Sequence, residues 1–184
     1  MTARIHWIDC RAAGRLAIMA RPRSGDWLAD EICGWREAGV DVVVSLLERD
    51  EVDELELHAE ERWCQDRGID FMSFPIPDRG VPASMRDMAA LAQTIANWVS
   101  SGRLVAIHCR AGIGRSSLVA ACALICLGEE PVSSFGLIRD ARGVSVPDTE
   151  DQREWVTGFH NFRVALSSQN LSIAPAIRPG EIDE

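Results

Sequence analysis

The sequence predicts an α/β fold in which helices flank both faces of a central, mostly parallel mixed sheet. Short apolar segments rich in β-branched residues alternate with longer amphipathic segments, and glycines and prolines separate the two kinds. The length of 184 residues suits one domain. We expect that domain over residues 1–166, followed by a polar tail at 167–184 that contains two prolines.

Four segments have the composition of buried strands. The clearest reads VDVVVSLL, a continuous apolar run of the kind found in parallel sheets that are covered on both faces. The four segments are residues 16–20, 40–47, 69–74 and 104–108.

Amphipathic or apolar segments between and after these strands predict helices. Asp26 is a candidate N-cap for a helix at 27–38, and Ser84 for one that ends near Ser101. The remaining helices are predicted at 51–67, 116–127, 132–141 and 149–162. The intervening segment PIPDRGVP, residues 75–82, must be a loop because its prolines exclude a helix or strand interior.

The composition excludes several functions. All 19 basic residues are Arg, so no lysine can serve a Walker loop, a Schiff base or a kinase nucleotide site. No Tyr is available as an acid or a base. The 28 acidic residues bring the net charge to −9, which argues against nucleic-acid partners because the surface repels phosphates.

Other features of the chain predict its location. No apolar run reaches 18 residues, and residues 1–11 already hold charged side chains, so we expect neither a membrane span nor a signal peptide. The six cysteines lie mostly in apolar contexts, which is typical of free thiols. These observations predict a cytoplasmic protein.

The segment HCRAGIGRS, residues 108–116, carries the most specific chemical signal. It follows a predicted strand and precedes a predicted helix, so its amide groups can converge into a cradle for an anion beside the helix N-terminus. Gly112 and Gly114 permit unusual backbone shapes and a close approach to a ligand. The candidate amide donors are those of Arg110, Ala111, Gly112, Ile113, Gly114 and Arg115.

Two side chains of this segment add reactivity to the cradle. Cys109 stands among the amide donors, which favours the nucleophilic thiolate over the thiol. Arg115 can hold two phosphate oxygens with its planar guanidinium. Residues 88–128 contain no Asp or Glu, so we expect a locally positive site. The alternatives are a plain buried cysteine beside a glycine turn, and a dinucleotide fingerprint, although Ser117 occupies its third glycine position.

Residues 108–116 resemble the His-Cys-x5-Arg-Ser/Thr signature of cysteine-dependent protein tyrosine and dual-specificity phosphatases. The resemblance implies a cysteinyl-phosphate intermediate and neither metal nor other cofactor. It implies that Cys109 is the nucleophile, that Arg115 holds the phosphate and that Ser116 donates a hydrogen bond to the sulfur. His108 would support the loop from behind.

The resemblance also calls for a general acid, and Asp78 in the loop at 75–82 is the candidate. Its context is Ile76-Pro77-Asp78, closer to the dual-specificity branch than the Trp-Pro-Asp of the tyrosine-specific branch. Gln152 resembles the glutamine that positions water in some branches, although it is equally an exposed residue at a helix start. Arg79 and Arg142 are candidates for extra positive charge near the mouth.

The expected substrate is a phosphorylated protein or a small phosphoester. The absence of Tyr favours a shallow site, open to phosphoserine and phosphothreonine as well as phosphotyrosine. Arg110 keeps phosphoinositides as an alternative, since some lipid-phosphate phosphatases carry basic residues there. The other hypotheses are a catalytically weak phospho-binding module, and an arsenate reductase or rhodanese, which also place a cysteine in an oxyanion cradle.

Overall fold

The apolar segments form one five-stranded sheet in the order β1-β2-β5-β3-β4, in a computed structural model that describes residues 4–168. β1 pairs with β2 in antiparallel fashion, and the other neighbours are parallel. The strands are β1 (His6–Ile8), β2 (Arg15–Ala20), β3 (Val42–Ser45), β4 (Asp70–Ser73) and β5 (Leu104–Cys109). The predicted fold class, a mostly parallel mixed sheet between helices, is confirmed.

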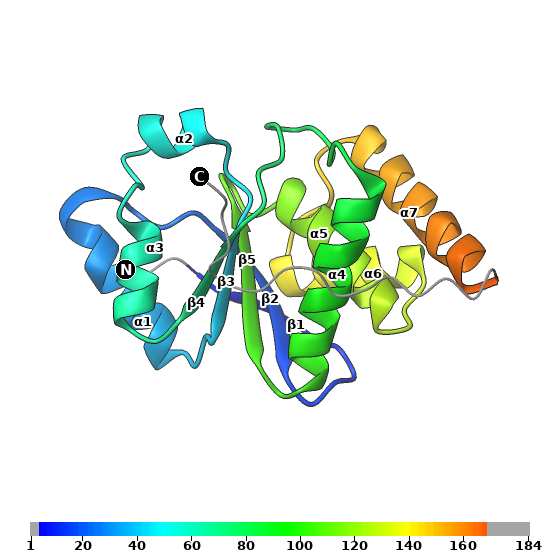
Figure 1. Ribbon diagram of the computed structural model, residues 1–184, viewed down its shortest axis with the longest axis horizontal. Coiled ribbons are helices and arrows are strands. Elements are labelled where there is room, and N and C mark those ends of the chain that lie inside the picture. Colours follow the sequence, from blue (N-terminus) through cyan, green and yellow to red (C-terminus); the bar gives the residue numbers. More distant parts are fainter. Residues whose placement is uncertain (1–3, 169–184) are drawn as a thin grey trace.

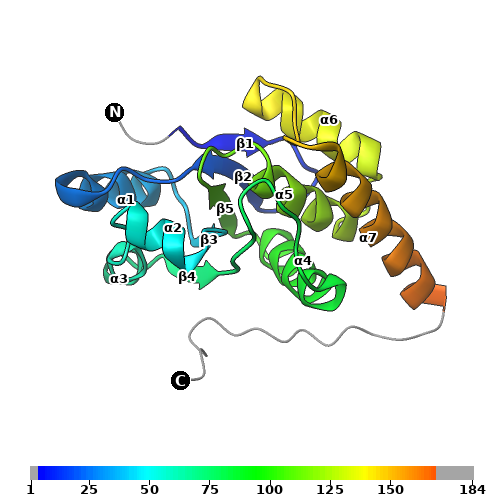
Figure 2. The same ribbon diagram turned by 90° about the horizontal axis from the view of Figure 1, so that it is seen from above.

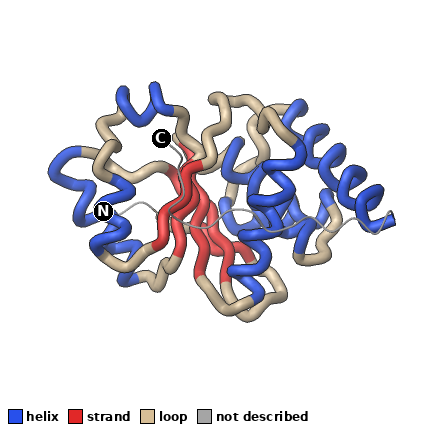
Figure 3. Tube along the Cα trace, in the orientation of Figure 1, coloured by secondary structure: helices blue, strands red, loops and turns tan. Residues whose placement is uncertain are grey.

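Helices cover both faces of this sheet (Figures 1 and 2). On one side lie α1 (Leu28–Glu37), α2 (Arg49–Glu54) and α3 (Glu60–Asp66). On the other lie α4 (Met85–Ser100), α5 (Arg115–Cys126), α6 (Pro131–Arg142) and α7 (Glu150–Ser168). Figure 3 shows the strands as the layer between the two groups of helices.

Side chains of the central strands alternate between the two cores. In β2, Leu16 and Ile18 pack into the core beneath α4 and α5, whereas Ala17 and Met19 pack into the core beneath α1 and α3. All four side chains are fully buried. Burial on both faces explains why the strand segments are continuously apolar instead of alternating with polar residues.

The carboxyl ends of the parallel strands meet at one edge of the sheet, the upper edge in Figure 1. Besides the segment from β2 to α1, three connections start there: the segment from β3 to α2, the loop at residues 75–82 after β4, and the loop from β5 to α5. Ligands in open α/β sheets bind at this edge. The topology therefore brings PIPDRGVP and HCRAGIGRS together.

The prediction of a single helix at 51–67 is wrong, because the segment forms α2 and α3 with a break between them. α2 ends in a Schellman motif, in which the Leu57 amide donates to the Val52 carbonyl (3.0 Å) and the Glu56 amide to the Asp53 carbonyl (3.2 Å). Glu56 has φ of 55°, an unusual conformation for a residue other than glycine. The break allows Leu57 to enter the core, where it is 2% exposed.

Other predicted boundaries also change. Asp26 does not cap the first helix, because it lies inside a 3-10 turn (Gly25–Trp27) that continues into α1. The edge strand β1 was not predicted, since three residues are too few to show a pattern. Ser84 does cap α4, accepting a hydrogen bond from the Asp87 amide at 3.2 Å.

The end of the chain is described in part. α7 continues to Ser168, six residues beyond its predicted end. Most of the tail predicted at 167–184 lies outside the described residues. None of the helices within residues 4–168 is both long enough and apolar enough to cross a bilayer.

Candidate active site

The loop at residues 109–114 runs from the end of β5 to the beginning of α5. α5 is a buried helix: each residue from Arg115 to Ile125 is buried. Its apolar sequence is therefore explained by packing against the sheet and against α4, α6 and α7. Its N-terminus, which carries the positive end of the helix dipole, begins directly after the loop.

The two glycines of the loop are required by close packing against other parts of the protein. Gly112 has φ of +67°, and a Cβ there would lie 2.4 Å from the carbonyl oxygen of Met19 in β2. A Cβ on Gly114 would lie 2.4 Å from a carboxylate oxygen of Asp148. Close packing within the protein therefore accounts for both glycines, and their predicted role in the approach of a ligand stays a prediction.

Cys109 and Ser116 lie at the two ends of the loop and face each other. Cys109 is 3% exposed and Ser116 is fully buried. The Cys109 Sγ atom lies 3.5 Å from Ser116 Oγ, within the range of a hydrogen bond that involves sulfur. The hydroxyl is thus placed to donate to a sulfur anion.

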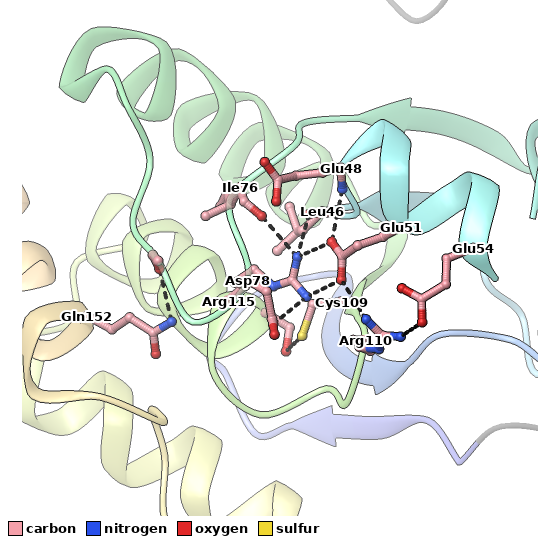
Figure 4. A network of polar contacts seen from close by, with 12 residues as sticks. Leu46, Glu48, Glu51, Glu54, Ile76, Asp78, Cys109, Arg110, Arg115 and Gln152 are labelled. Atoms are coloured by element: carbon pink, nitrogen blue, oxygen red, sulfur yellow. Dashed lines mark hydrogen bonds and ion pairs between the residues drawn. The ribbon is translucent and has the colours of Figure 1, made fainter.

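Arg115 is 2% exposed, and its guanidinium is held by several acceptors (Figure 4). It donates two parallel hydrogen bonds to Glu51 of α2, at 2.6 and 2.9 Å. Nη2 also donates to Asp78 at 2.9 Å, and Nη1 to the Ile76 carbonyl at 2.9 Å. A bidentate carboxylate fixes both the position and the plane of the guanidinium.

Glu51 is a site residue that the sequence analysis missed. It lies among Glu48, Asp50, Asp53 and Glu54, and no sequence signal separates it from these acidic neighbours. In the structure it is buried and closes a capping box with Glu48 at the start of α2. This local bond and the ion pair with Arg115 use both of its oxygens.

The ion pair changes the pKa of both partners. Burial by itself raises the pKa of Glu51, but the hydrogen bonds from Arg115 and the Glu48 amide outweigh burial, so the pKa lies below its ordinary value. For Arg115 the directions are opposite. Burial by itself lowers its pKa, but the carboxylate of Glu51, together with the nearby Cys109 and Asp78, outweighs burial, so the pKa is raised. The pair is therefore ionised at neutral pH.

Asp78 reaches the site from the loop at residues 75–82. The loop turns tightly, with the Gly80 amide donating to the Pro77 carbonyl at 2.8 Å and Arg79 at φ of 55°. The Asp78 side chain is 55% exposed, although its carboxylate contacts Arg115. The structure thus places Asp78 beside Arg115 at the open side of the cysteine loop, while Arg79 is exposed.

Gln152 lies at the start of α7 and is fully buried, not exposed. Its amide nitrogen donates to the Gly80 carbonyl at 3.0 Å, and its amide oxygen accepts from the Asp148 amide at 3.2 Å. A Cβ on Gly114 would lie 3.0 Å from the same oxygen. Gln152 therefore links the loop that carries Asp78 to α7 beside the cysteine loop.

Arg142, at the end of α6, contacts the backbone of the cysteine loop. Its Nε donates to the Gly112 carbonyl at 2.9 Å, and its Nη2 to the Ala111 carbonyl at 3.3 Å. Because a trans peptide directs its N–H opposite to its C=O, these bonds turn the amides of Gly112 and Ile113 away from Arg142. Arg142 therefore orients two of the six candidate amide donors, and its predicted contribution of positive charge near the mouth stays a prediction.

His108 lies behind the loop, on the face of the sheet covered by α1 and α3. It is fully buried, and its Nε2 lies 2.9 Å from an oxygen of Glu60, which is itself buried. The centroid of its ring lies 6.3 Å from the ring centroid of Trp35. These contacts anchor the end of β5 from the side opposite to α5.

The site is less positive than the acid-free stretch at 88–128 predicted. Arg110 forms an ion pair with Glu54, and its Nη1 lies 3.8 Å from Glu51 (Figure 4). The positive charge of Arg115 is likewise shared with Glu51 and Asp78. The acidic partners come from α2 and the loop at 75–82, which are distant in sequence but meet the cysteine loop at the same edge of the sheet.

A central parallel strand here ends in a cysteine, the next loop closes on an arginine at a helix N-terminus, and a carboxylate faces that arginine. Fold and site together are those of the dual-specificity phosphatase class. Residues 2–164 match the family described as "Swiss Army Knife protein, DSP-PTPase phosphatase domain", and the chain belongs to this family.

Curated relatives share part of the sequence. Cyclin-dependent kinase inhibitor 3 of Rattus norvegicus is 31% identical over 115 residues, which are 61% of this chain and 54% of the relative. The Homo sapiens protein of the same name is 32% identical over 106 residues, 56% of this chain and 48% of the relative. The chain thus spans about half the length of the curated relatives it matches.

Solved structures share the fold over most of the chain. Kinase associated phosphatase, with its catalytic-site cysteine replaced by serine, has a TM-score of 0.80 at 23% identity and covers 91% of this chain and 98% of its own. PTPMT1 has a TM-score of 0.72 at 22% identity, and the match covers 91% of this chain and 100% of the PTPMT1 chain. Tk-PTP in its active form has a TM-score of 0.68 at 26% identity, and the match covers 85% of this chain and 96% of the Tk-PTP chain.

Proposed function

We propose that this chain hydrolyses phosphomonoesters through a cysteinyl-phosphate intermediate, as a dual-specificity-type protein phosphatase. The observation that carries the proposal is the placement of Cys109 Sγ 3.5 Å from Ser116 Oγ, in the loop that Arg115 closes and Glu51 holds rigid. Preorganised donors of this kind stabilise the charge that develops on a phosphoryl group during transfer. All six cysteines are free thiols, which supports a reducing, cytoplasmic location.

In the first step, the Cys109 thiolate attacks phosphorus while the amides of the loop and the Arg115 guanidinium hold the phosphoryl oxygens. The S–P bond forms as the bond from phosphorus to the substrate oxygen breaks. The Asp78 carboxyl acts as the general acid and gives a proton to the leaving oxygen. The 2.9 Å contact between Asp78 and Arg115 supports the position that this role requires, because it puts the side chain of Asp78 beside the group that binds the phosphate.

In the second step, water attacks the phosphocysteine and the S–P bond breaks, releasing phosphate and the thiolate. Asp78, now a carboxylate, accepts the proton from the water. Ser116 donates a hydrogen bond to the departing sulfur, for which its 3.5 Å distance is suited. Gln152 holds the loop that carries Asp78, because its side-chain nitrogen donates to the Gly80 carbonyl and its side-chain oxygen accepts from the Asp148 amide.

A phosphorylated protein is the substrate class that the comparisons favour. The similar proteins named cyclin-dependent kinase inhibitor 3 and kinase associated phosphatase have a protein kinase in their names, which supports a phosphoprotein substrate. Action on phosphoserine and phosphothreonine beside phosphotyrosine is supported by the family description, DSP-PTPase phosphatase domain. The exposed position of Asp78 supports a shallow site. The alternative is a phosphoinositide, favoured by the structural likeness to PTPMT1, which was solved in complex with PI(5)P.

The proposal is tested by trapping the intermediate. The chain, incubated with an aryl phosphate in excess EDTA and quenched in acid within milliseconds, is expected to carry one phosphate on the peptide that contains Cys109. Vanadate is expected to prevent both labelling and turnover. Turnover that requires a metal would refute the mechanism, and so would a phosphate on any other residue. Phosphopeptide binding without labelling or turnover would instead support a binding module.

Asp78→Asn is expected to slow hydrolysis of a substrate with a poor leaving group by about 10²–10⁴-fold, because the leaving oxygen loses its proton donor. The loss should be much smaller with p-nitrophenyl phosphate, whose leaving group needs little protonation. Steady-state kinetics with both substrates measure this difference. Asp140→Asn, an exposed change on α6, is the matched control and should leave both rates unchanged. Equal losses with both substrates would remove Asp78 from the role of acid.

A further inference from the structure

Arg110 is the second arginine of the cysteine loop, and it does not have a free charge. Its side chain is 38% exposed, yet Nη2 bonds the Glu54 carboxylate and Nη1 lies 3.8 Å from Glu51 (Figure 4). Glu54 is the last residue of α2 and is 61% exposed. The hydrogen bond to Glu54 raises the pKa of Arg110, so the guanidinium stays charged and its charge is offset by the carboxylate that it contacts.

The surroundings of this pair are acidic. Residues 48–56 hold six acidic side chains and one arginine, and they lie beside the cysteine loop through Glu51 and Glu54. Arg115 and Arg110 therefore meet carboxylates from one helix. One bound phosphoryl group can still use the loop amides and Arg115, whereas a second anionic group next to it would meet Glu54 and a neutralised Arg110.

We propose that Glu54 is a specificity-determining residue, which pairs with Arg110 and selects against substrates that carry a second phosphate beside the reacting one. The site then favours a single phosphate on a neutral or cationic polypeptide over a polyphosphorylated inositol. This inference rests on the proposed function and gives its substrate class. A polyanion must either displace the Glu54 carboxylate or lie against it, and like charges at close range lower affinity and association rate.

The test is a comparison of two substrates across four proteins. The substrates are a phosphotyrosyl peptide with arginines beside the phosphorylated residue and inositol 1,3,4,5-tetrakisphosphate. The proteins are the unchanged chain, Glu54→Gln, Asp53→Asn and the double variant Glu54→Gln/Arg110→Gln. Asp53 is the matched control, because it neighbours Glu54 on α2, is 56% exposed and pairs with His58.

The unchanged chain is expected to have the higher kcat/KM for the peptide. Glu54→Gln should shift the ratio of the two kcat/KM values about 3- to 10-fold toward the inositol phosphate, since it removes the shorter of the two carboxylate contacts of Arg110 and leaves only the longer one to Glu51. Asp53→Asn should shift the ratio much less, and the double variant should reverse the shift. The effect of Glu54→Gln should shrink at 0.5 M salt, where exposed charges are screened.

Three results would overturn the inference: a ratio that Glu54→Gln does not move, an equal shift in Asp53→Asn, or a preference of the unchanged chain for the inositol phosphate. The same ligands are also titrated by calorimetry against the four proteins in a Cys109→Ser background. This affinity ratio depends on binding alone. If no protein turns over substrate, but Glu54→Gln still shifts the ratio of the two affinities toward the inositol phosphate, the proposed catalysis is rejected and the role of Glu54 is supported.

Discussion

Cys109→Ser is expected to abolish phosphatase turnover, with a loss of about 10⁵-fold or more, the order seen when an enzyme loses its nucleophile. A serine hydroxyl is far less acidic than a thiol and does not form an anion in the same cradle at neutral pH. The change replaces sulfur by a smaller oxygen beside Ser116, so the fold and the anion site should persist. Hydrolysis of p-nitrophenyl phosphate at saturating substrate measures the loss.

Two controls separate loss of the nucleophile from loss of the fold. Cys33→Ser changes a partly exposed cysteine on α1 and should retain full activity. Cys109→Ser should still bind vanadate or tungstate and should unfold at the same urea concentration as the unchanged chain. Retention of activity in Cys109→Ser would reject the covalent mechanism, whatever the controls show.

Glu51→Ala is expected to lower the free energy of unfolding by about 3–5 kcal/mol, the cost of removing one member of a buried ion pair. Arg115 is 2% exposed and would lose both of its short hydrogen bonds to α2. The guanidinium would also lose its fixed plane, so kcat/KM should fall with the stability. Urea unfolding and steady-state kinetics on the same preparation measure both effects.

The pH dependence of stability gives Glu51 a signature that a general packing defect would not show. Its pKa in the folded chain is lowered, so its contribution is complete above the ordinary glutamate value of about 4.3 and is lost as the pH falls through the lowered pKa. Stability of the unchanged chain should therefore converge on that of Glu51→Gln in acid. A difference that stays constant down to pH 3 would contradict the ion pair.

Asp53→Asn is the control for these stability measurements. It removes the same charge from the same helix without a contact to Arg115, and surface substitutions of this kind change stability by less than about 0.5 kcal/mol. An equal loss in Asp53→Asn and Glu51→Ala would show that α2 simply needs negative charge. That outcome would remove Glu51 from the positioning of Arg115.

Much of the fold followed from local patterns. β3 and β5 were predicted because strands buried on both faces are apolar throughout, and α4 because Ser84 and an amphipathic run mark its extent. The break between α2 and α3 was missed because the left-handed residue that ends α2 is Glu56 and not a glycine. β1 was missed because its three residues are defined mainly by pairing with β2.

The sequence by itself determined which groups residues 108–116 bring together, because a cysteine, a loop and an arginine within nine consecutive residues cannot be separated by any fold that keeps the loop intact. Only the tertiary structure decided which carboxylates meet the two arginines. Along the sequence, Glu51 is 64 residues and Asp78 is 37 residues away from Arg115. Glu54 is 56 residues away from Arg110. In a run of acidic residues all carboxylates look alike, and only the position of α2 beside the cysteine loop gives Glu51 and Glu54 their arginine partners.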